Sequence, residues 1–255
     1  MFTIVFVVAV VGGLAWLMLR PRELVYEGKS VSYLLMQYEW SPHGQEIKPA
    51  QDALHKIGTN AIPLYLKWVE SKDALLKDKI ILLARKQSLI PIRWFTTGEY
   101  RFLGRLGFEV LGSDAAPAVP ALIKLLNESS DPNIQGEAAL SLGRIGPAAQ
   151  DAVPALIAVL RCFDSDDSYC AVAALGNIHS KPELAVPALI RHLEKSGLRP
   201  VDLRRTIESI GNFGTNAQAA IPALEQLAKD PDNDIRSWAS DVLKQIKPEA
   251  VESSK

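Results

Sequence analysis

The five residues 118–122 read AVPAL, and the same letters return at 152–156 and 185–189, with AIPAL at 220–224. A shorter copy, AIPL, stands at 61–64. The prolines of the four full copies, at positions 120, 154, 187 and 222, are separated by 34, 33 and 35 residues. Repetition at one period of about 20 to 50 residues is typical of stacked repeat arrays. The chain is therefore expected to be an array in which each unit adds one layer.

Each unit is expected to contain two helices. Proline is tolerated only in a first turn, where its missing N–H had no partner, so each AVPAL copy is expected to begin a helix. Asp-rich turns at 131–133 (DPN), 164–166 (DSD) and 230–232 (DPD) then cap a second helix. We take LGRIG at 142–146, LGNI at 175–178 and IESIG at 207–211 as the corresponding second-helix endings. A pair of this size cannot bury its apolar face alone, which makes stacking obligatory.

The regular units are assigned to residues 113–247, followed by a polar tail at 248–255. Residues 30–112 are interpreted as less regular helical pairs. Their predicted helices lie at 31–38, 47–57, 60–69 and 73–87. Pro63 and Pro120 are 57 residues apart, which is longer than one period, so we place an insert at 88–107, SLIPIRWFTTGEYRFLGRLG. Residues 99–111, which begin within this insert, are expected to form the second helix that packs against the next unit.

Two groups of residues are candidate binding residues. The insert and its surroundings are aromatic and basic, and could bind an acidic partner, with aromatic and arginine side chains as anchors. Its candidates are Arg93, Trp94, Phe95, Tyr100, Arg101 and Arg105. The alternative is that these aromatic residues fill the gap left by a longer unit. The second group, Arg144, Asn177 and Arg236, is expected on the outward stripe of the second helices, which usually lines a concave face.

The N-terminal stretch 2–19 contains no charged residue and is closed by Arg20-Pro21-Arg22. As a helix it would measure about 27 Å, close to the thickness of a hydrocarbon core. We expect residues 1–19 to form a single-pass membrane anchor, with a cleaved signal peptide as the alternative. Residues 20–29 are interpreted as a tether. A bacterial inner membrane is expected. The side remains open, because the basic residues after the span favour the cytoplasm while single N-terminal anchors often export their domain.

Composition argues against several kinds of function. The formal net charge is −1, which gives no field that would favour nucleic acid. The four histidines, at positions 43, 55, 179 and 192, include no pair at i, i+4, and no phosphate-binding glycine loop is present. Cys162 and Cys170 cannot form a disulfide framework. No catalytic residues, metal or cofactor are predicted, and the protein is not expected to be an enzyme.

Residues 134–146, IQGEAALSLGRIG, carry a resemblance to the HEAT-repeat superfamily. The segment is similar to the short bacterial repeats of phycobilisome lyases, whose second helix reads I-x-x-x-A-A-x-x-L-G-x-I-G. The resemblance covers 60–246 and, weakly, 30–58. Departures are Asp167 at the position of Ile134 and an irregular second helix near Pro200.

The resemblance implies an all-α protein, a right-handed α-α superhelix preceded by one transmembrane helix. The arrangement also resembles membrane-tethered bacterial HEAT-repeat proteins of unassigned function. We expect a non-catalytic, membrane-anchored scaffold that binds a protein or peptide, and expect no nucleic acid. The alternative implied by the resemblance is a bilin-lyase-related enzyme or a chaperone-like binder of small molecules. Trp238, on the last second helix, is expected to cap the apolar end of the array.

Overall fold

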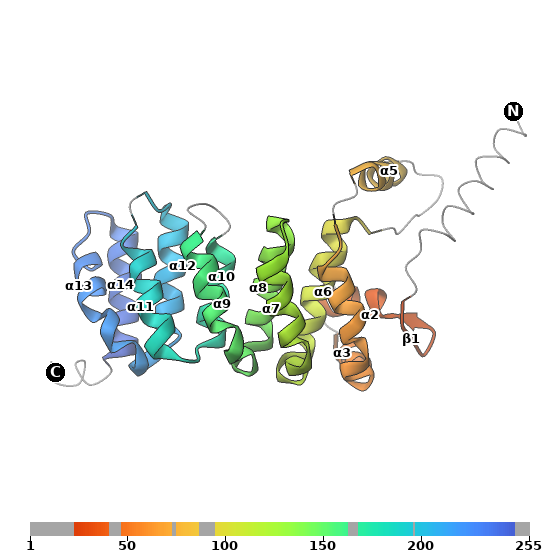
Figure 1. The fold of residues 1–255 in the computed structure, drawn as a ribbon, viewed down its shortest axis with the longest axis horizontal. Helices are drawn as coiled ribbons and strands as arrows, with labels where there is room; N and C mark the ends of the chain where they lie inside the picture. The colour runs from red at the N-terminus through yellow and green to blue at the C-terminus, as the bar shows by residue number, and fades with distance from the viewer. Residues whose placement is uncertain are drawn as a thin grey trace, which may run out of the picture.

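The structure is a computed structural model that describes residues 23–40, 47–72, 75–86, 95–162, 168–195 and 197–247. Several expectations fall outside the described residues. They are the anchor at 1–19, the turn at 164–166 and the tail at 248–255, together with the candidates Arg93 and Trp94. The described chain forms an all-α solenoid, as the repeat pattern predicts, with one small hairpin at its N-terminal end (Figure 1).

The elements follow one another as short helices joined by tight turns. After the N-terminal hairpin, the described elements are α-helices and short 3-10 helices. In chain order the elements are β1 (Val25–Tyr26), β2 (Lys29–Ser30), α2 (Val31–Trp40), α3 (Ile47–Ile57), η1 (Gly58–Ala61), α4 (Ile62–Val69), α5 (Leu75–Lys86), α6 (Thr97–Leu111), η2 (Gly112–Ala118), α7 (Val119–Glu128), α8 (Pro132–Ile145), η3 (Gly146–Ala152), α9 (Val153–Cys162), α10 (Ser168–Ile178), α11 (Pro182–Leu193), α12 (Pro200–Gly211), η4 (Gly214–Ala220), α13 (Ile221–Leu227) and α14 (Asn233–Ile246).

The helices pair as first and second members of stacked units. The first helices α4, α7, α9, α11 and α13 pack against the second helices α6, α8, α10, α12 and α14, respectively, and each second helix packs against the next. The run Thr97–Glu128 is long and apolar enough to cross a membrane. It consists of α6, η2 and α7, and half of its most apolar window is buried in the array, as expected for core helices.

Local signals in the sequence predict most helix boundaries correctly. Pro63, Pro120, Pro154 and Pro222 lie in the first turns of α4, α7, α9 and α13. The Asp131 side chain accepts a hydrogen bond from the Asn133 amide at 2.9 Å, and Asp232 accepts one from the Asp234 amide at 2.8 Å. These N-caps satisfy amides that the helix itself leaves without partners.

The hairpin at the N-terminal end was not expected. Residues 20–29 were interpreted as a tether, but Val25 and Ser30 pair across an antiparallel two-stranded ladder. Glu27 and Gly28 form its turn with φ of 48° and 78°, a conformation typical of two-residue hairpin loops. Ser30 still accepts a hydrogen bond from the Tyr33 amide at 3.3 Å, as expected of a residue that caps α2. The chain therefore enters α2 through an ordered turn.

The pairing of α4 differs from the prediction. Residues 73–87 were expected to be its partner, but α4 packs against α6, and the described part of that segment forms α5 outside the array (Figure 1). Residues 97–107, assigned to the insert, belong to α6, which packs against α8 as predicted for the helix expected at 99–111. The reason is steric. Gly104 and Gly107 let α6 lie directly on Tyr65 of α4, an approach that the bulky residues of α5 could not make.

One first helix begins earlier than predicted. Pro187 was expected in a first turn, but α11 begins at Pro182 and holds Pro187 in its interior. The other regular units reach their first helix through a 3-10 segment, whereas here Lys181 adopts a left-handed φ of 52° immediately before Pro182. Proline favours the first helical position, so the helix starts five residues ahead of the AVPAL proline.

The burial of His192, on α11, predicts that the stability of the protein depends on pH. The residue is 3% exposed, and neither ring nitrogen has a hydrogen-bond partner among the described residues. Burial, and to a lesser degree Lys195, lowers the pKa of His192, while Asp202 of α12 acts in the opposite direction. The unfolded chain therefore binds a proton at a higher pH than the folded chain. Stability must fall as the pH drops through about 6.5 toward the folded-state pKa.

We expect His192→Leu to raise the free energy of unfolding by about 1 kcal/mol at pH 7, and by more at pH 5, because it removes a buried polar group without a partner. Leucine suits the site, since the positions five residues after Pro120 and Pro222 are Leu125 and Leu227. Urea unfolding at both pH values tests this. His55→Gln, at an exposed histidine, is the control. Equal pH dependence in parent and His192→Leu would contradict the prediction.

Candidate binding site

Three second helices are followed by a glycine with a positive φ. Gly112 and Gly146 come directly after α6 and α8, with φ of 52° and 77°, and Gly214 comes two residues beyond Asn212, the C-cap of α12, with φ of 52°. This alignment corrects the predicted register of the third ending. IESIG at 207–211 was matched to LGRIG at 142–146, but the equivalent residues are IGNFG at 210–214.

Close helix contacts support the corrected register. A Cβ on Gly143 would lie 2.9 Å from Ala174 Cα and 3.5 Å from Asn177 Nδ2. A Cβ on Gly211 would lie 3.0 Å from Gln245 Oε1 in the same way. The residue after each of these glycines therefore occupies one position of the unit. We call this set, Arg144, Asn177, Asn212 and Gln245, the polar row, and all four residues are exposed.

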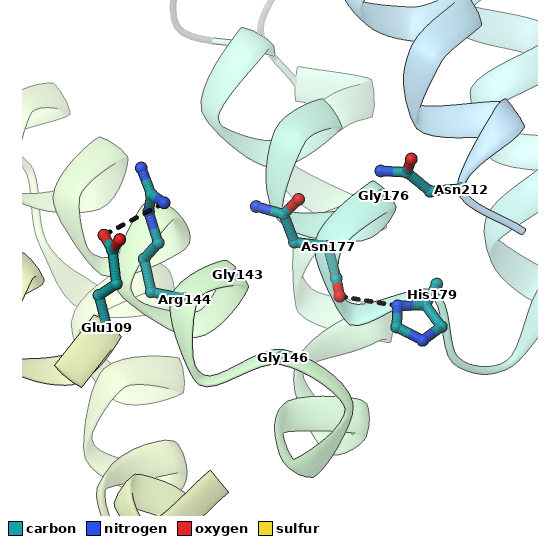
Figure 2. Close-up of a pocket in the computed structure, with 8 residues that line it drawn as sticks. All are labelled: Glu109, Gly143, Arg144, Gly146, Gly176, Asn177, His179 and Asn212. Atoms are coloured by element: carbon teal, nitrogen blue, oxygen red, sulfur yellow. Dashed lines mark hydrogen bonds and ion pairs between the residues drawn. The ribbon is translucent and has the colours of Figure 1, made fainter. Parts of the chain in front are cut away.

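Three residues of the polar row line an open groove that extends over four units, from α6 to the end of α12 (Figure 2). The groove is lined by Glu109, Gly143, Arg144, Gly146, Gly176, Asn177, His179 and Asn212. Arg144 Nη1 lies 3.1 Å from Glu109 Oε2 on the neighbouring second helix, so the guanidinium is held at the edge of the groove. The side chains of Asn177 and Asn212 follow it along the array, with their carboxamides toward solvent.

His179 occupies the position that Gly112, Gly146 and Gly214 hold in three other units. Its φ is 34°, which is unfavourable for a residue with a Cβ. The ring Nδ1 lies 2.9 Å from the backbone oxygen of Asn177. Because a carbonyl only accepts, Nδ1 carries the hydrogen, and Nε2 of the neutral ring is then an acceptor. Backbone strain of this kind is concentrated at functional positions.

We expect His179→Gly to raise the free energy of unfolding by about 0.5 to 1 kcal/mol, because relief of the left-handed strain exceeds the entropy lost by glycine on folding. The same change should weaken binding in the groove, since it removes a ring that lines it. Thermal unfolding measures the first effect. His179→Ala is the control, since it removes the ring but keeps the strain and should not stabilise. Destabilisation by glycine would show that the ring is needed for the fold.

The groove offers donors and acceptors of hydrogen bonds. A carboxamide has both an N–H donor and a C=O acceptor, which match those of a peptide group. The ends of α8 and α10 also place their partial negative charge here, and favour donors on a bound molecule. Among the described residues, no three His, Cys, Asp or Glu side chains gather in a way that could hold a metal ion.

The described insert candidates pack into the array. Tyr100 is 8% exposed and Arg101 4% exposed, and Phe95 and Trp68 each contact the Tyr100 ring. Arg101 Nε donates a hydrogen bond to the Ser71 carbonyl oxygen at 2.9 Å. This bond links α6 to the chain that follows α4. These contacts agree with the alternative that the aromatic residues fill space beside a longer unit.

Arg105 is also engaged within the array. Its Nε lies 3.4 Å from Glu137 Oε2, and its guanidinium lies 5.1 Å from the centre of the Phe102 ring. Burial raises the pKa of Glu137, although Arg105 and Arg101 act to lower it. Arg105 therefore offsets the cost of a half-buried carboxylate between α6 and α8.

Arg236 lies away from the polar row. Its Nη1 donates to the carbonyl oxygens of Asp230 and Pro231, at 2.5 and 2.8 Å. Gln135, on α8 and three helix pairs earlier in the array, makes equivalent bonds to the carbonyl oxygens of Leu126 and Ser129. Both side chains therefore satisfy carbonyls in the turn between a first and a second helix. Trp238 lies partly buried on α14, with the Arg204 guanidinium 5.5 Å from its ring centre.

Of the sequence candidates that the structure describes, only Arg144 and Asn177 meet in the groove. Sequence reasoning missed Glu109, His179 and Asn212. Asn212 was missed because the predicted register of the ending at 207–211 was wrong by three residues. The signal for His179 was available, because a histidine replaces the glycine that follows the helix in the neighbouring units.

Residues 105–176 match the family model of HEAT repeats. This segment is therefore similar to HEAT repeats. It runs from within α6 to α10, and so includes Glu109, Arg144 and most of the groove. No curated protein matches the chain. The HEAT-repeat match agrees with the stacked helical pairs and supports placing the array in the HEAT-repeat superfamily.

Proposed function

We propose that this protein is a non-catalytic scaffold that binds an extended segment of a partner protein along the polar row. The observation that carries the proposal is the recurrence of an exposed amide or guanidinium, at Arg144, Asn177, Asn212 and Gln245, on four successive second helices. HEAT repeats commonly mediate protein interactions. An array of this kind offers a long surface and needs no catalytic cluster to act.

The spacing of the row suits an extended polypeptide. Packed helices lie about 8 to 10 Å apart, and an extended chain advances about 3.3 Å per residue. Each step of the row therefore matches about three residues of a bound strand. Asn177 and Asn212 can pair with backbone groups of any sequence, whereas Arg144 and His179 can select a side chain. We therefore expect the partner to bind through an extended peptide segment that places a hydrogen-bond acceptor near Arg144.

We further propose that residues 2–19 anchor the scaffold in a membrane, and that this membrane is a bacterial inner membrane. The support is in the sequence, where 18 residues without charge are followed by Arg20 and Arg22. The repeats are also proposed to be of the short bacterial type found in phycobilisome lyases, on the basis of the IQGEAALSLGRIG segment at 134–146. The right-handed sense of the superhelix follows from that type.

The test compares two double variants of the full chain. Asn177→Ala with Asn212→Ala removes both carboxamides from the groove. Asn127→Ala with Asn216→Ala removes two exposed amides elsewhere, on α7 and η4. Affinity capture from membrane extract, with mass spectrometry, identifies the partner, and titration then measures its affinity. We expect the groove variant to bind about tenfold more weakly or worse, at about 1 kcal/mol per lost hydrogen bond, and the control to bind as the parent does.

Two results would contradict the proposal. Equal capture by both variants would place the partner elsewhere on the chain. Recovery of a pigment or other small molecule, with no specific protein, would instead favour the enzyme or small-molecule binder implied by the likeness to lyases.

A further inference from the structure

Exposed apolar side chains collect at the N-terminal end of the described array. Five of them belong to α5, where Leu75 and Leu76 are 73% and 75% exposed. Four more belong to β1 and α2 or the residue before them, among them Trp40 at 56%. The full α5 set is Leu75, Leu76, Ile80, Leu82 and Leu83. Elsewhere in the described chain, the exposed large apolar residues are Leu184 and Val201, which are isolated from one another in sequence.

Asp78 links α5 to the array. Its Oδ1 accepts hydrogen bonds from the backbone N–H of Thr97 at 3.0 Å and from its hydroxyl at 3.2 Å, at the start of α6. Ile81, three residues on, is 3% exposed. The exposed leucines stand on the other sides of the helix. They therefore belong to a helix that is bound to α6 through Asp78.

The charge of α5 suits an anionic surface. Residues 75–86 contain four basic residues, Lys77, Lys79, Arg85 and Lys86, and one acidic residue, Asp78. The single carboxylate is bound to Thr97, while Lys79 is exposed beside the leucines. Exposed leucines mixed with lysines are typical of helices that lie in a membrane interface, with the apolar stems in the acyl boundary and the ammonium groups among the lipid headgroups.

The same end of the array lies close to where the apolar stretch joins it. Only residues 20–22 separate Leu19 from the described chain, so Glu23 can lie no more than about 14 Å from the end of a span that stops at Leu19. Trp40 stacks near Phe102 of α6, with ring centres 5.6 Å apart. Thr97, which holds α5, is five residues earlier on that helix, about 7.5 Å along its axis. Trp40 and α5 therefore belong to one neighbourhood.

We infer that α5 and Trp40 form a second membrane-contact surface, which rests on the interface of an anionic bilayer and holds the N-terminal end of the array against it. The inference rests on the proposed anchor at residues 2–19. Tryptophan is enriched at this depth of a membrane. With two contacts, the array would be held at a fixed tilt, and the polar row would be presented at a defined distance from the bilayer.

The experiment uses the full chain in lipid nanodiscs that contain anionic phosphatidylglycerol. A solvatochromic fluorophore is attached through cysteine at position 76 or 83, or at position 184 as the control. Cys162→Ser and Cys170→Ala form the background, and its thermal melt is compared with the parent. Leu184 is a matched control because it is 45% exposed on α11, away from α5. Nitroxide-labelled lipid then reports whether lipid itself is close to each label.

We expect blue-shifted emission and quenching by nitroxide lipid at 76 and 83, and neither effect at 184. Water-like emission at all three sites, in a chain that resists carbonate extraction, would overturn the inference and leave the anchor in place. A blue shift without quenching would also overturn it, since a protein surface would then cover α5. Release of the chain by carbonate would refute both the anchor and the inference.

Discussion

Gly107→Ala is expected to lower the free energy of unfolding by about 3 kcal/mol, the largest single effect in this chain. An added Cβ would lie 2.4 to 2.6 Å from three atoms of the Tyr65 ring, far inside van der Waals contact. The Tyr65 ring cannot move away easily, because the residue is fully buried and packs edge-on against Phe108, with ring centres 5.7 Å apart. Urea unfolding followed by far-UV circular dichroism measures the change.

Gly98→Ala is the matched control for this prediction. Gly98 lies on the same helix, α6, and nothing stands within 4 Å of the Cβ it would gain. Alanine favours the helix over glycine, so this variant should be as stable as the parent or more stable, by up to about 1 kcal/mol. If both variants lost the same stability, the effect would come from helix propensity or the unfolded state, and the close contact between α4 and α6 would be refuted.

The second large effect is expected from Gly176→Ala, at about 2 to 3 kcal/mol. The new Cβ would lie 2.7 to 2.8 Å from the Oγ, Cα and Cβ of Ser209, so that α10 and α12 would have to separate. Units of a repeat array are coupled only through their neighbours, and a weakened interface lowers that coupling. We therefore expect unfolding to divide into two transitions, with α11 to α14 lost first.

Gly136→Ala tests whether any second-helix glycine behaves in this way. Its Cβ would meet only the Cys170 sulfur at 3.2 Å, within reach of a small side-chain adjustment. We expect a change of less than about 1 kcal/mol and a single transition. Hydrogen exchange by residue identifies the part that opens first in Gly176→Ala. A single transition that spans the whole array would contradict the prediction.

Features set by local chemistry could be predicted from the sequence. The repeat period predicts that the units stack. The prolines and aspartates predict where helices begin, because these residues act on the backbone of their own turn. The pairing of α4 could not be predicted in this way. The apolar pattern of α5 is the same whether its leucines face a core or solvent, and only the tertiary contact of Gly107 with Tyr65 decides between α5 and α6.

The groove was predictable only in part. Arg144 and Asn177 follow a glycine in an obvious repeat, and their stripe could be read directly. Asn212 required the φ of Gly214, which corrects the register by three residues. Arg236 is on a second helix like the others, but its reach to the Pro231 carbonyl depends on the turn that precedes it. Long polar side chains near a turn can satisfy carbonyls as readily as they bind a partner.

The most direct test of the proposed function is photo-crosslinking from the polar row. Benzoylphenylalanine is placed at position 144, 177 or 212 of the full chain, and at 127 as a control on the opposite layer. The account predicts partner adducts from the three row positions and few from 127. It also predicts that the crosslinked partner residues advance in one direction, by about three residues per unit. Equal yields at 127, or adducts with no order along the partner, would contradict binding of an extended segment in the groove.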